Sequence, residues 1–315
     1  MYRPGAAVML KLSLGLRLTN SRREHTRAEL RRGTEVHRLL DAGLADATMA
    51  AYPGFRIVRD PAWLAVHTPD DADGHAPTHL DLSVREVAEG LVEAVCLAGL
   101  VAPRPGIGPS RLAHEVRALA ARTGVAARDV AVEWTRRHVD GVLAPMVHLY
   151  ATTGIGLEAH QQNTLVRFDR DGWPATGWFR DNQGFYLAAW GLPGVLDHLG
   201  GAAETSLAVA PEEMVDDPLT YYLLFNNVLG VVGALGAEGL AEEDRLLQAV
   251  GDRLAALVAR GGDTPTGLVA RWLEADTLPC KANFLTRMAG IDEVLAPRRR
   301  PVGLPRRAQP PPGDG

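Results

Sequence analysis

The N-terminal part of the chain changes from an alternating pattern of apolar and polar positions to a helical one. Residues 8–19 (VMLKLSLGLRLT) alternate apolar with small or basic residues, which predicts a β-strand. Residues 22–42 have the apolar spacing of a helix that is exposed on one side and weakened near Gly33. Residues 54–67 predict one or two further strands, and the polar composition of residues 68–79 predicts an exposed loop.

Helical spacing predominates in the rest of the chain, with one interruption by a hairpin. The apolar positions predict helices near residues 84–98, 111–122, 127–152, 217–235, 240–260 and 265–275. The segment 102–110 (APRPGIGPS) predicts a loop, and residues 164–169 and 174–179 predict two strands joined by the turn 169–172. The tail from Pro297 holds five arginines, six prolines and three glycines, which predicts disorder. These elements predict an α+β fold with a helix-rich second half.

Composition narrows the class of protein. A hydrophobic share of 46% excludes disorder for most of the 315 residues, and a net charge of -5 argues against a general nucleic-acid binder. Two cysteines, Cys96 and Cys280, are too few for a disulfide scaffold or a Cys-rich zinc site and indicate a cytoplasmic protein. No apolar run reaches bilayer length, and Lys11 and Arg17 interrupt the apolar N-terminal stretch, so neither a membrane span nor a signal peptide is expected.

The densest group of chemically active side chains lies in the segment 156–163 (GLEAHQQN). If this segment continues the preceding helix, Glu158 and Gln162 share one face, and His160 and Asn163 share a neighbouring face. A carboxylate and an amide oxygen at that spacing can hold Mg²⁺, and a histidine beside an amide N–H₂ can bind anionic oxygens. The alternative is a polar helix end whose side chains cap backbone groups, and the spacing favours the two interpretations equally.

Two further groups carry charge at strand ends. Asp181 follows Arg180 at the end of a predicted strand, where it is either a second metal ligand or half of a local ion pair. Lys11 and Thr19 share parity along the first predicted strand and precede Arg23, so they could bind phosphate or carboxylate. Basic residues are also common at strand-to-helix junctions, and no Walker or dinucleotide fingerprint supports the first interpretation.

Three segments together resemble one family. GIGLEAHQQNTLVRF, followed by GWPATGWFRDNQG, resembles the catalytic segment of the template-independent siderophore synthetases of the IucA/IucC type. KLSLGLRLTNSRR resembles the family's early K-x-x-L…T-x-x-x-R segment, and LPCKANFLTRMAG at 278–290 resembles its late K-A-x-L-x-x-R segment. The matches follow the family's order and cover roughly residues 8–295, of which the later part is also named a FhuF-like ferric iron reductase region.

The resemblance implies a helix-rich, palm-like catalytic domain with an antiparallel β-sheet floor. Residues 1–150 would then carry the Lys/Thr/Arg motif as part of the fingers and palm. Residues 151–296 would form the helix-rich palm and C-terminal region, and residues 297–315 a disordered tail.

The resemblance also implies an ATP-dependent carboxylate–amine ligase. In the family a carboxylic acid, often citrate, attacks the α-phosphate of Mg-ATP, and an amine or alcohol then attacks the acyl-adenylate. By this resemblance Lys11 and Thr19 contact the ATP phosphates, and Arg23 binds the substrate carboxylate. His160, Gln162 and Asn163 contact the nucleotide and the carboxylate, and Glu158 and Asp181 are the Mg²⁺ ligands. Lys281 and Arg287 have no assigned role. The implied cofactors are ATP and Mg²⁺, and the implied partners are the small-molecule substrates and a second copy in a homodimer.

Length separates this chain from the resembled family. Family chains are about twice as long, and their N-terminal half carries an H-P-x-H-P-x-x-K stretch that is not found here. We therefore expect a fragment, a mis-called start or a truncated relative that by itself lacks half of an ATP site. Two alternatives are an inactive partner of a full-length synthetase and a ferric-siderophore reductase-like protein, although Cys280 alone cannot hold a [2Fe–2S] centre.

Overall fold

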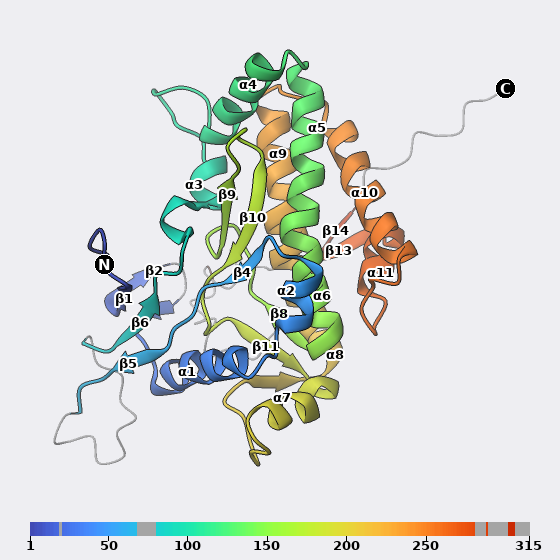
Figure 1. The fold of residues 1–315 in the computed structure, drawn as a ribbon. Coiled ribbons are helices and arrows are strands. Elements are labelled where there is room, and N and C mark those ends of the chain that lie inside the picture. Colours follow the sequence, from blue (N-terminus) through green and yellow to red (C-terminus); the bar gives the residue numbers. More distant parts are fainter. Residues whose placement is uncertain (19–20, 68–79, 281–287, 289–301, 306–315) are drawn as a thin grey trace.

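The computed structural model describes residues 1–18, 21–67, 80–280, 288 and 302–305, and within them a helical bundle stands beside several small sheets (Figure 1). The helices are α1 (Arg27–Asp41), α2 (Asp46–Ala51), α3 (Leu97–Val101), α4 (Arg111–Thr123), α5 (Ala127–His138), α6 (Ala144–Thr153), α7 (Leu192–His198), α8 (Glu212–Leu219), α9 (Gly230–Ala237), α10 (Glu243–Ala259) and α11 (Leu268–Glu274). Two π-helical segments, Val139–Leu143 and Thr220–Leu229, join α5 to α6 and α8 to α9. Short 3₁₀ turns cover Leu91–Glu93 and Ala189–Gly191.

The strands form five small sheets. They are β1 (Val8–Leu12), β2 (Leu14–Leu18), β3 (Ser21–Arg23), β4 (Phe55–Ile57), β5 (Ala62–Leu64), β6 (Leu82–Glu86), β7 (Val95–Cys96), β8 (Ile155–Leu157), β9 (Thr164–Phe168), β10 (Pro174–Phe179), β11 (Phe185–Ala188), β12 (Ala208–Ala210), β13 (Thr277–Cys280) and β14 (Val302–Pro305). Their orders are β1-β6-β5, β4-β10-β9-β7, β12-β11-β8, β13-β14 and β2-β3. The predicted α+β class is confirmed.

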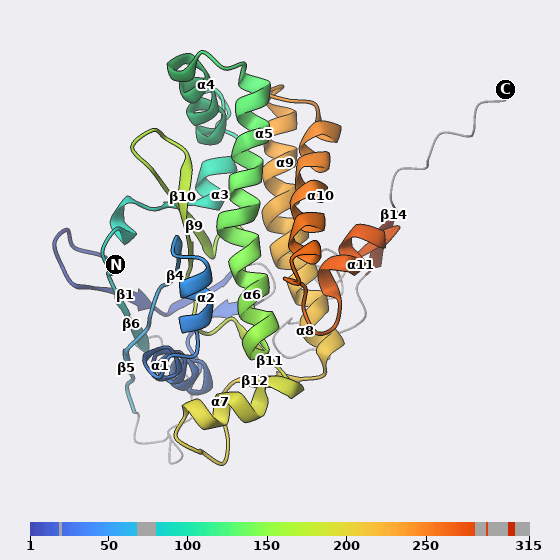
Figure 2. The same ribbon diagram turned by 45° about the vertical axis from the view of Figure 1, so that its right-hand side comes forward.

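The helices predicted from residue 111 onward form the bundle. α5 and α6 run end to end and pack beside α9 and α10 (Figure 2). One hydrophobic cluster, which extends from Val36 to Trp272, joins the bundle to β4, β8, β9, β10 and β11. The proposed domain division near residue 150 stays a prediction, because this cluster includes residues from both sides of it.

Two of the five sheets of the described residues are mixed and the other three are antiparallel, which corrects the wholly antiparallel floor that the resemblance implied. β9 and β10 form the predicted antiparallel hairpin, but β4 pairs with β10 in parallel, and β12 pairs with β11 in parallel. Parallel pairing requires a long connection, and more than a hundred residues separate β4 from β10. Residues 54–67 give two strands, β4 and β5, as expected.

The prediction of a helix at residues 84–98 is wrong. The structure has β6 there, then a 3₁₀ turn, β7 and the start of α3. β6 buries Ser83 and Arg85 and leaves its apolar positions half-buried, so its alternation is the reverse of an ordinary strand. Arg85 can be buried because its Nε and Nη2 donate to the two carboxylate oxygens of buried Asp60, at 2.7 and 3.1 Å.

The N-terminal elements also differ in detail from the prediction. The single strand expected at 8–19 is two strands that change sheet at Ser13, whose backbone N and Oγ both donate to the Asp81 carbonyl. The helix expected at 22–42 begins at Arg27, after a capping box in which Thr26 and Glu29 satisfy each other's backbone N–H. It then runs through Gly33 without a break.

Two other predicted regions are partly described. Residues 68–79, the expected loop, lie outside the described residues. In the tail, residues 302–305 form β14, which pairs with β13, and the rest of the segment from Pro297 lies outside the described residues. These four residues depart from the expected disorder because their backbone groups are paired.

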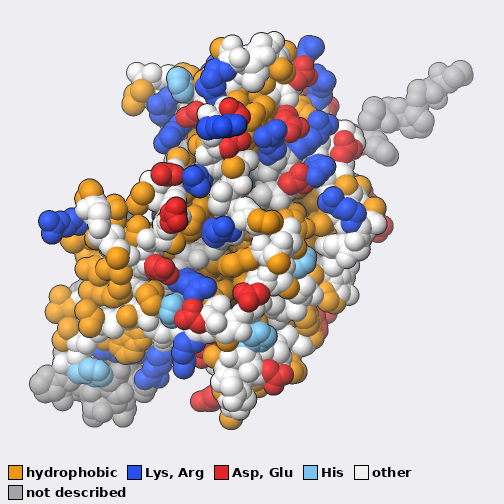
Figure 3. Space-filling view, viewed as in Figure 1, with side chains coloured by type: hydrophobic (Ala, Val, Ile, Leu, Met, Phe, Trp, Pro, Cys, Tyr) orange, Lys and Arg blue, Asp and Glu red, His pale blue; other side chains and the backbone are white. Residues whose placement is uncertain are grey.

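The sheet β1-β6-β5 turns an apolar face outward. Leu12, Leu82 and Leu64 lie opposite one another on neighbouring strands of this face. Leu12 is 46% and Leu64 63% exposed, and Val8 beside them is 42% exposed. Figure 3 shows hydrophobic side chains gathered over this sheet. We call it the outer face, and an exposed apolar face of this kind is typical of an interaction surface.

Within the part of the chain that the structure describes, one helix is long and apolar enough to cross a membrane by length and composition. It covers Glu212–Ala237, which is α8, the π-helical segment and α9, and 56% of its most apolar window is buried inside the protein. Core helices of soluble proteins pass the same test. Its buried residues include Val215, Leu223 and Val231, which belong to the hydrophobic cluster and account for its apolar character.

Candidate functional site

The structure brings the early lysine segment and the segment after β10 together, through an ion pair between Lys11 and Asp181. Lys11 lies on β1, on the side of the sheet opposite the outer face, and its Nζ donates to Asp181 Oδ1 at 2.9 Å and to Gln183 Oε1 at 2.8 Å. Asp181 and Lys11 are 170 positions apart in the sequence. The partner of Asp181 is therefore Lys11, whereas its sequence neighbour Arg180 donates to the Gln162 carbonyl.

Asp181 is held as a carboxylate in an unusual backbone conformation. Burial by itself would raise its pKa, but the charge and hydrogen bond of Lys11 and the charge of Arg85 outweigh burial, so the pKa of Asp181 is lowered. Its φ is +95°, and among the described residues it is the one non-glycine residue with a positive φ. Asp is one of the few residues that tolerate this region, and strain of this kind gathers at functional sites.

His25 and Gln183 complete this cluster, and the sequence analysis missed both. Gln183 donates through Nε2 to His25 Nδ1 at 3.0 Å, and His25 Nε2 lies 3.0 Å from the Lys11 carbonyl. His25 is therefore a neutral ring with its proton on Nε2, in agreement with a pKa lowered by burial and by the charge of Lys11. The one sequence signal was position, since His25 lies two residues after Arg23 and Gln183 two residues after Asp181.

The segment 158–163 is a loop that does not continue the preceding helix, so the shared helix faces considered for its side chains do not exist. α6 ends at Thr153, and Gly154 follows in the left-handed region with φ +76°. A Cβ at Gly154 would lie 2.9 Å from the Cα of Gly191, which leaves no room for a side chain. The chain then enters β8 (Ile155–Leu157), which pairs with β11. All three residues of β8 are buried.

The loop begins beside the turn that carries Asp181. Glu158 N donates to the Gly184 carbonyl at 2.9 Å, and Gly184 N donates to the Asp181 carbonyl at 3.0 Å. A Cβ at Gly184 would lie 3.0 Å from the Glu158 Cβ and 3.5 Å from the Asp181 carbonyl oxygen. The two predicted magnesium ligands therefore come from adjoining turns, although the helical spacing that suggested Glu158 does not exist.

Asn163 closes the loop on itself. Its side chain is 5% exposed, and its Nδ2 donates to the Glu158 carbonyl at 3.0 Å. Its backbone N donates to the His160 carbonyl at 2.9 Å. The His160 ring lies edge-on to Tyr222, and its Nε2 is 4.0 Å from Glu158 Oε1. Asn163 thus binds a backbone group, as the capping alternative expected, although no helix ends at this loop, and its contact with a nucleotide stays a prediction.

Other predicted residues are placed less fully. Gln162 is exposed, and it is the backbone carbonyl of Gln162 that accepts from Arg180. Arg23 is exposed at the end of β3, and its role stays a prediction. Thr19, Lys281 and Arg287 lie outside the described residues.

The carboxylates of Glu158 and Asp181 suit a Mg²⁺ ion that binds together with the phosphates of a nucleotide. Within the described ranges, no group of three or more His, Cys, Asp or Glu side chains is close enough to hold a metal ion. Magnesium commonly binds through one or two carboxylates together with substrate phosphates and waters. Glu158 and Asp181, with Lys11 beside them as a cation for phosphate, match that arrangement.

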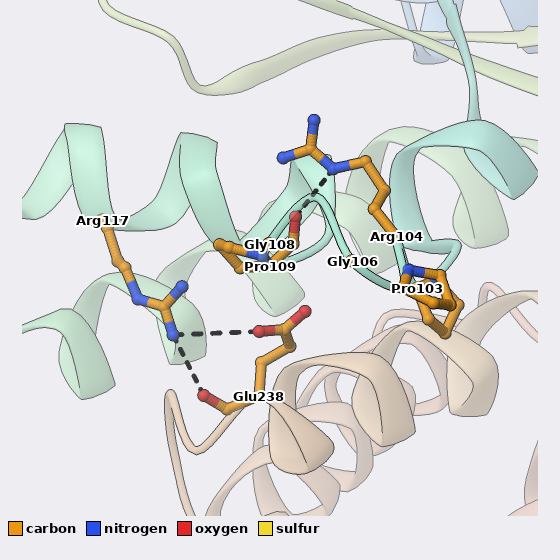
Figure 4. Close-up of a pocket in the computed structure, with 8 residues that line it drawn as sticks. Pro103, Arg104, Gly106, Gly108, Pro109, Arg117 and Glu238 are labelled. Atoms are coloured by element: carbon orange, nitrogen blue, oxygen red, sulfur yellow. Dashed lines mark hydrogen bonds and ion pairs between the residues drawn. The ribbon is translucent and has the colours of Figure 1, made fainter.

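Two surface hollows lie away from this cluster. A surface hollow of about 550 Å³ lies between the loop 102–110 and the end of α9, where Arg117 donates to the Glu238 carbonyl (Figure 4). A second, of about 410 Å³, is lined by residues of the α2–β4 turn, the first π-helical segment and β10. No predicted site residue lines either hollow, so the candidate site is a partly exposed polar surface between β1, the loop 158–163 and the turn after β10.

Comparison with known proteins agrees with the motifs. Residues 1–102 match the model of the IucA / IucC family, and residues 132–295 match the model described as ferric iron reductase FhuF-like transporter. A spermidine-citrate ligase of Bacillus anthracis is 32% identical over 305 residues, which are 96% of this chain and 49% of that protein. The rhizobactin siderophore biosynthesis protein RhbC of Rhizobium meliloti is 38% identical over 301 residues, which are 94% of this chain and 50% of that protein.

The fold agrees as well. The ATP-bound aerobactin synthetase IucA of Klebsiella pneumoniae superposes with a TM-score of 0.82 at 30% identity, over 92% of this chain and 51% of that one. The chain thus spans about half the length of the curated relatives that it matches. From its motifs, its fold and both family matches, the chain belongs to the IucA/IucC family of siderophore synthetases, with a FhuF-like region as its second part.

Proposed function

We propose that this chain supplies part of the active site for an ATP-dependent ligation in siderophore biosynthesis. The observation that carries the proposal is the contact of Lys11 with Asp181 beside Glu158, because one cation and two carboxylates suit a Mg-nucleotide. In this reaction a carboxylate oxygen attacks the α-phosphorus of ATP and pyrophosphate leaves. An amine or alcohol then attacks the acyl carbon of the adenylate, and AMP leaves.

The proposed roles follow the chemistry of each side chain. Lys11 contacts the nucleotide phosphates, and Glu158 and Asp181 hold Mg²⁺, which neutralises charge on the phosphates when bound. Arg23 binds the carboxylate of the acid through its planar fork of donors. His160 contacts the nucleotide and the acid. Citrate is the proposed acid and a polyamine-like amine the proposed nucleophile, because one relative is named a spermidine-citrate ligase.

Citrate-dependent ATP–pyrophosphate exchange tests this proposal. We expect negligible exchange from the 315-residue chain alone and clear exchange from a version extended at its N-terminus to the length of the relatives, which we call the extended protein. In the extended protein, R23K should raise KM for citrate far more than KM for ATP, because lysine cannot form a bidentate pair. Absence of exchange from the extended protein with every di- or tricarboxylate would overturn the proposal.

The reductase alternative is not favoured. The relatives with the matches given above are named for ligation or siderophore synthesis, and Cys96 and Cys280 are the two cysteines of the chain. A protein-bound [2Fe–2S] cluster requires four ligands, commonly cysteines. The cytoplasm is the proposed location, since two cysteines are too few for a disulfide scaffold.

We also expect the isolated chain to self-associate through the outer face, in line with the proposed homodimer. Replacing Leu12 and Leu64 together by Ser should abolish a concentration-dependent rise in the sedimentation coefficient without unfolding the chain, because both side chains are exposed. L247S is the matched control, since Leu247 is 43% exposed on α10, away from this sheet. Equal sedimentation of the three proteins at all concentrations would contradict this expectation.

A further inference from the structure

Two consecutive asparagines, Asn226 and Asn227, form hydrogen bonds to the loop 158–163. Asn226 and Asn227 lie on the π-helical segment Thr220–Leu229, and both form hydrogen bonds to backbone groups of the loop. Asn226 Oδ1 accepts a hydrogen bond from Gln161 N at 3.0 Å. π-Helical turns are rare in proteins and frequently occur at functional sites. The two asparagines were not among the residues singled out from the sequence.

Both the nitrogen and the oxygen of the Asn227 side-chain amide form hydrogen bonds. Its Nδ2 donates to the Ala159 carbonyl and to Thr164 Oγ1, both at 2.8 Å, and its Oδ1 lies 2.9 Å from His138 Nε2. Asn227, Ala159 and Thr164 have 0% exposure and His138 has 1%. Ala159 lies near the start of the loop and Thr164 directly follows it, so a single buried side chain joins its two ends. In a buried setting, each of these groups would be costly to leave without a partner.

His138 fixes the orientation of that amide. Because Asn227 Nδ2 already donates twice, Oδ1 must face the histidine, and His138 must carry its proton on Nε2. The ring stacks on Trp134 at 5.3 Å, which holds its plane. Its Nδ1 has no hydrogen-bond partner among the described residues. His138 is the last residue of α5, directly before the other π-helical segment, Val139–Leu143.

We propose that Asn226 and Asn227 are positioning residues that set the shape of the loop 158–163, with His138 fixing the orientation of the Asn227 amide. None of the three lies on the loop or touches the ion pair of Lys11 and Asp181. They act by placing Glu158 and His160 opposite that pair. The functional consequence rests on the proposed function, whereas the effect on loop shape does not.

The experiment compares N227L with T220V. N227L keeps the branching and the number of heavy atoms of the side chain but removes all three hydrogen bonds. Thr220 is a matched control, because it is 3% exposed on the same π-helical segment and accepts from Trp272 Nε1, on the side of α11. In the extended protein, N227L should weaken Mg-ATP binding by about tenfold or more, and T220V, at a similar loss of melting temperature, should stay within about twofold of wild type.

A second measurement on the 315-residue chain needs no nucleotide. Hydrogen exchange of the Gln161 and Asn163 amides, which donate to Asn226 Oδ1 and the His160 carbonyl, should accelerate in N227L relative to amides of α4. In T220V the loop and α4 should change together. Equal behaviour of the two variants in loop exchange overturns the positioning role, whether or not the protein binds ATP. Accelerated loop exchange with wild-type nucleotide affinity would instead contradict the link to the proposed function.

Conservative variants keep the test informative if N227L does not fold. H138Q retains a donor where Nε2 lies, so it should preserve loop exchange, whereas H138L should reproduce the N227L pattern. N226A removes one acceptor and should accelerate exchange at Gln161 more than at Asn163. Identical results for H138Q and H138L would show that the histidine acts by packing alone and would remove it from the proposal.

Discussion

Replacement of Asp181 by Asn is expected to weaken Mg-ATP binding by the extended protein about tenfold to a hundredfold. The ion pair with Lys11 and the proposed metal contact both depend on the carboxylate charge. A charge-assisted hydrogen bond contributes about 1.5–3 kcal/mol, and about 1.4 kcal/mol corresponds to a tenfold change in affinity. Isothermal titration with Mg-ATP measures the effect, and E158Q should act in the same direction.

Asn is chosen as the replacement because it should keep the backbone conformation of residue 181, so that a loss of affinity reports the loss of the carboxylate charge. Asp181 has φ +95°, and after glycine, Asn is among the residues that best tolerate a positive φ. D171N is the matched control, because Asp171 lies exposed in the turn of the same β9–β10 hairpin. Wild-type affinity in D181N, or an equal loss in D171N, would remove Asp181 from the site.

A second large effect is expected in acid, where His138 should cost the protein about 3 kcal/mol of stability between pH 7 and pH 4. Burial lowers the pKa of His138 to about 4, although the hydrogen bond with Asn227 acts in the opposite direction. An unfolded histidine titrates near pH 6.5, so between these values the unfolded chain binds a proton that the folded chain does not. Stability therefore falls as the pH falls through this range.

Urea unfolding of wild type and H138Q at pH 7, 5.5 and 4 measures this contribution. H138Q should lose less stability than wild type by about 3 kcal/mol at pH 4, because glutamine does not titrate. His25 and His148 also have pKa values lowered mainly by burial, so H138Q should keep part of the acid sensitivity. Parallel stability curves for the two proteins would contradict the assignment.

The elements with a one-sided apolar pattern were predictable. The hairpin β9–β10, the helices α4, α5, α6 and α10, and the loop 102–110 lie where their patterns placed them. In α4, α5 and α10 the buried side chains follow the helical period. Motif resemblance located the loop 158–163, Lys11 and Asp181 as candidates without showing how they meet.

Elements with a reversed or interrupted pattern were not predictable. β6 buries Arg85 and Ser83, so its polar positions face inward and its period misled the prediction. The helical spacing considered for residues 158–163 does not occur, because Gly154 ends α6 and the chain then pairs as β8. In both cases long-range pairing outweighed local preference, as it commonly does for short segments.

The sequence by itself determined which residue types are available for chemistry: a lysine on an early strand, a polar loop and a carboxylate after a hairpin. Tertiary structure alone decided that Lys11 pairs with Asp181, that Gln183 and His25 complete that cluster, and that Asn226 and Asn227 hold the loop. The physical reason is that these contacts join segments 65 to 170 positions apart. Their partners are chosen by the burial of polar groups that must be satisfied, and no local pattern records that choice.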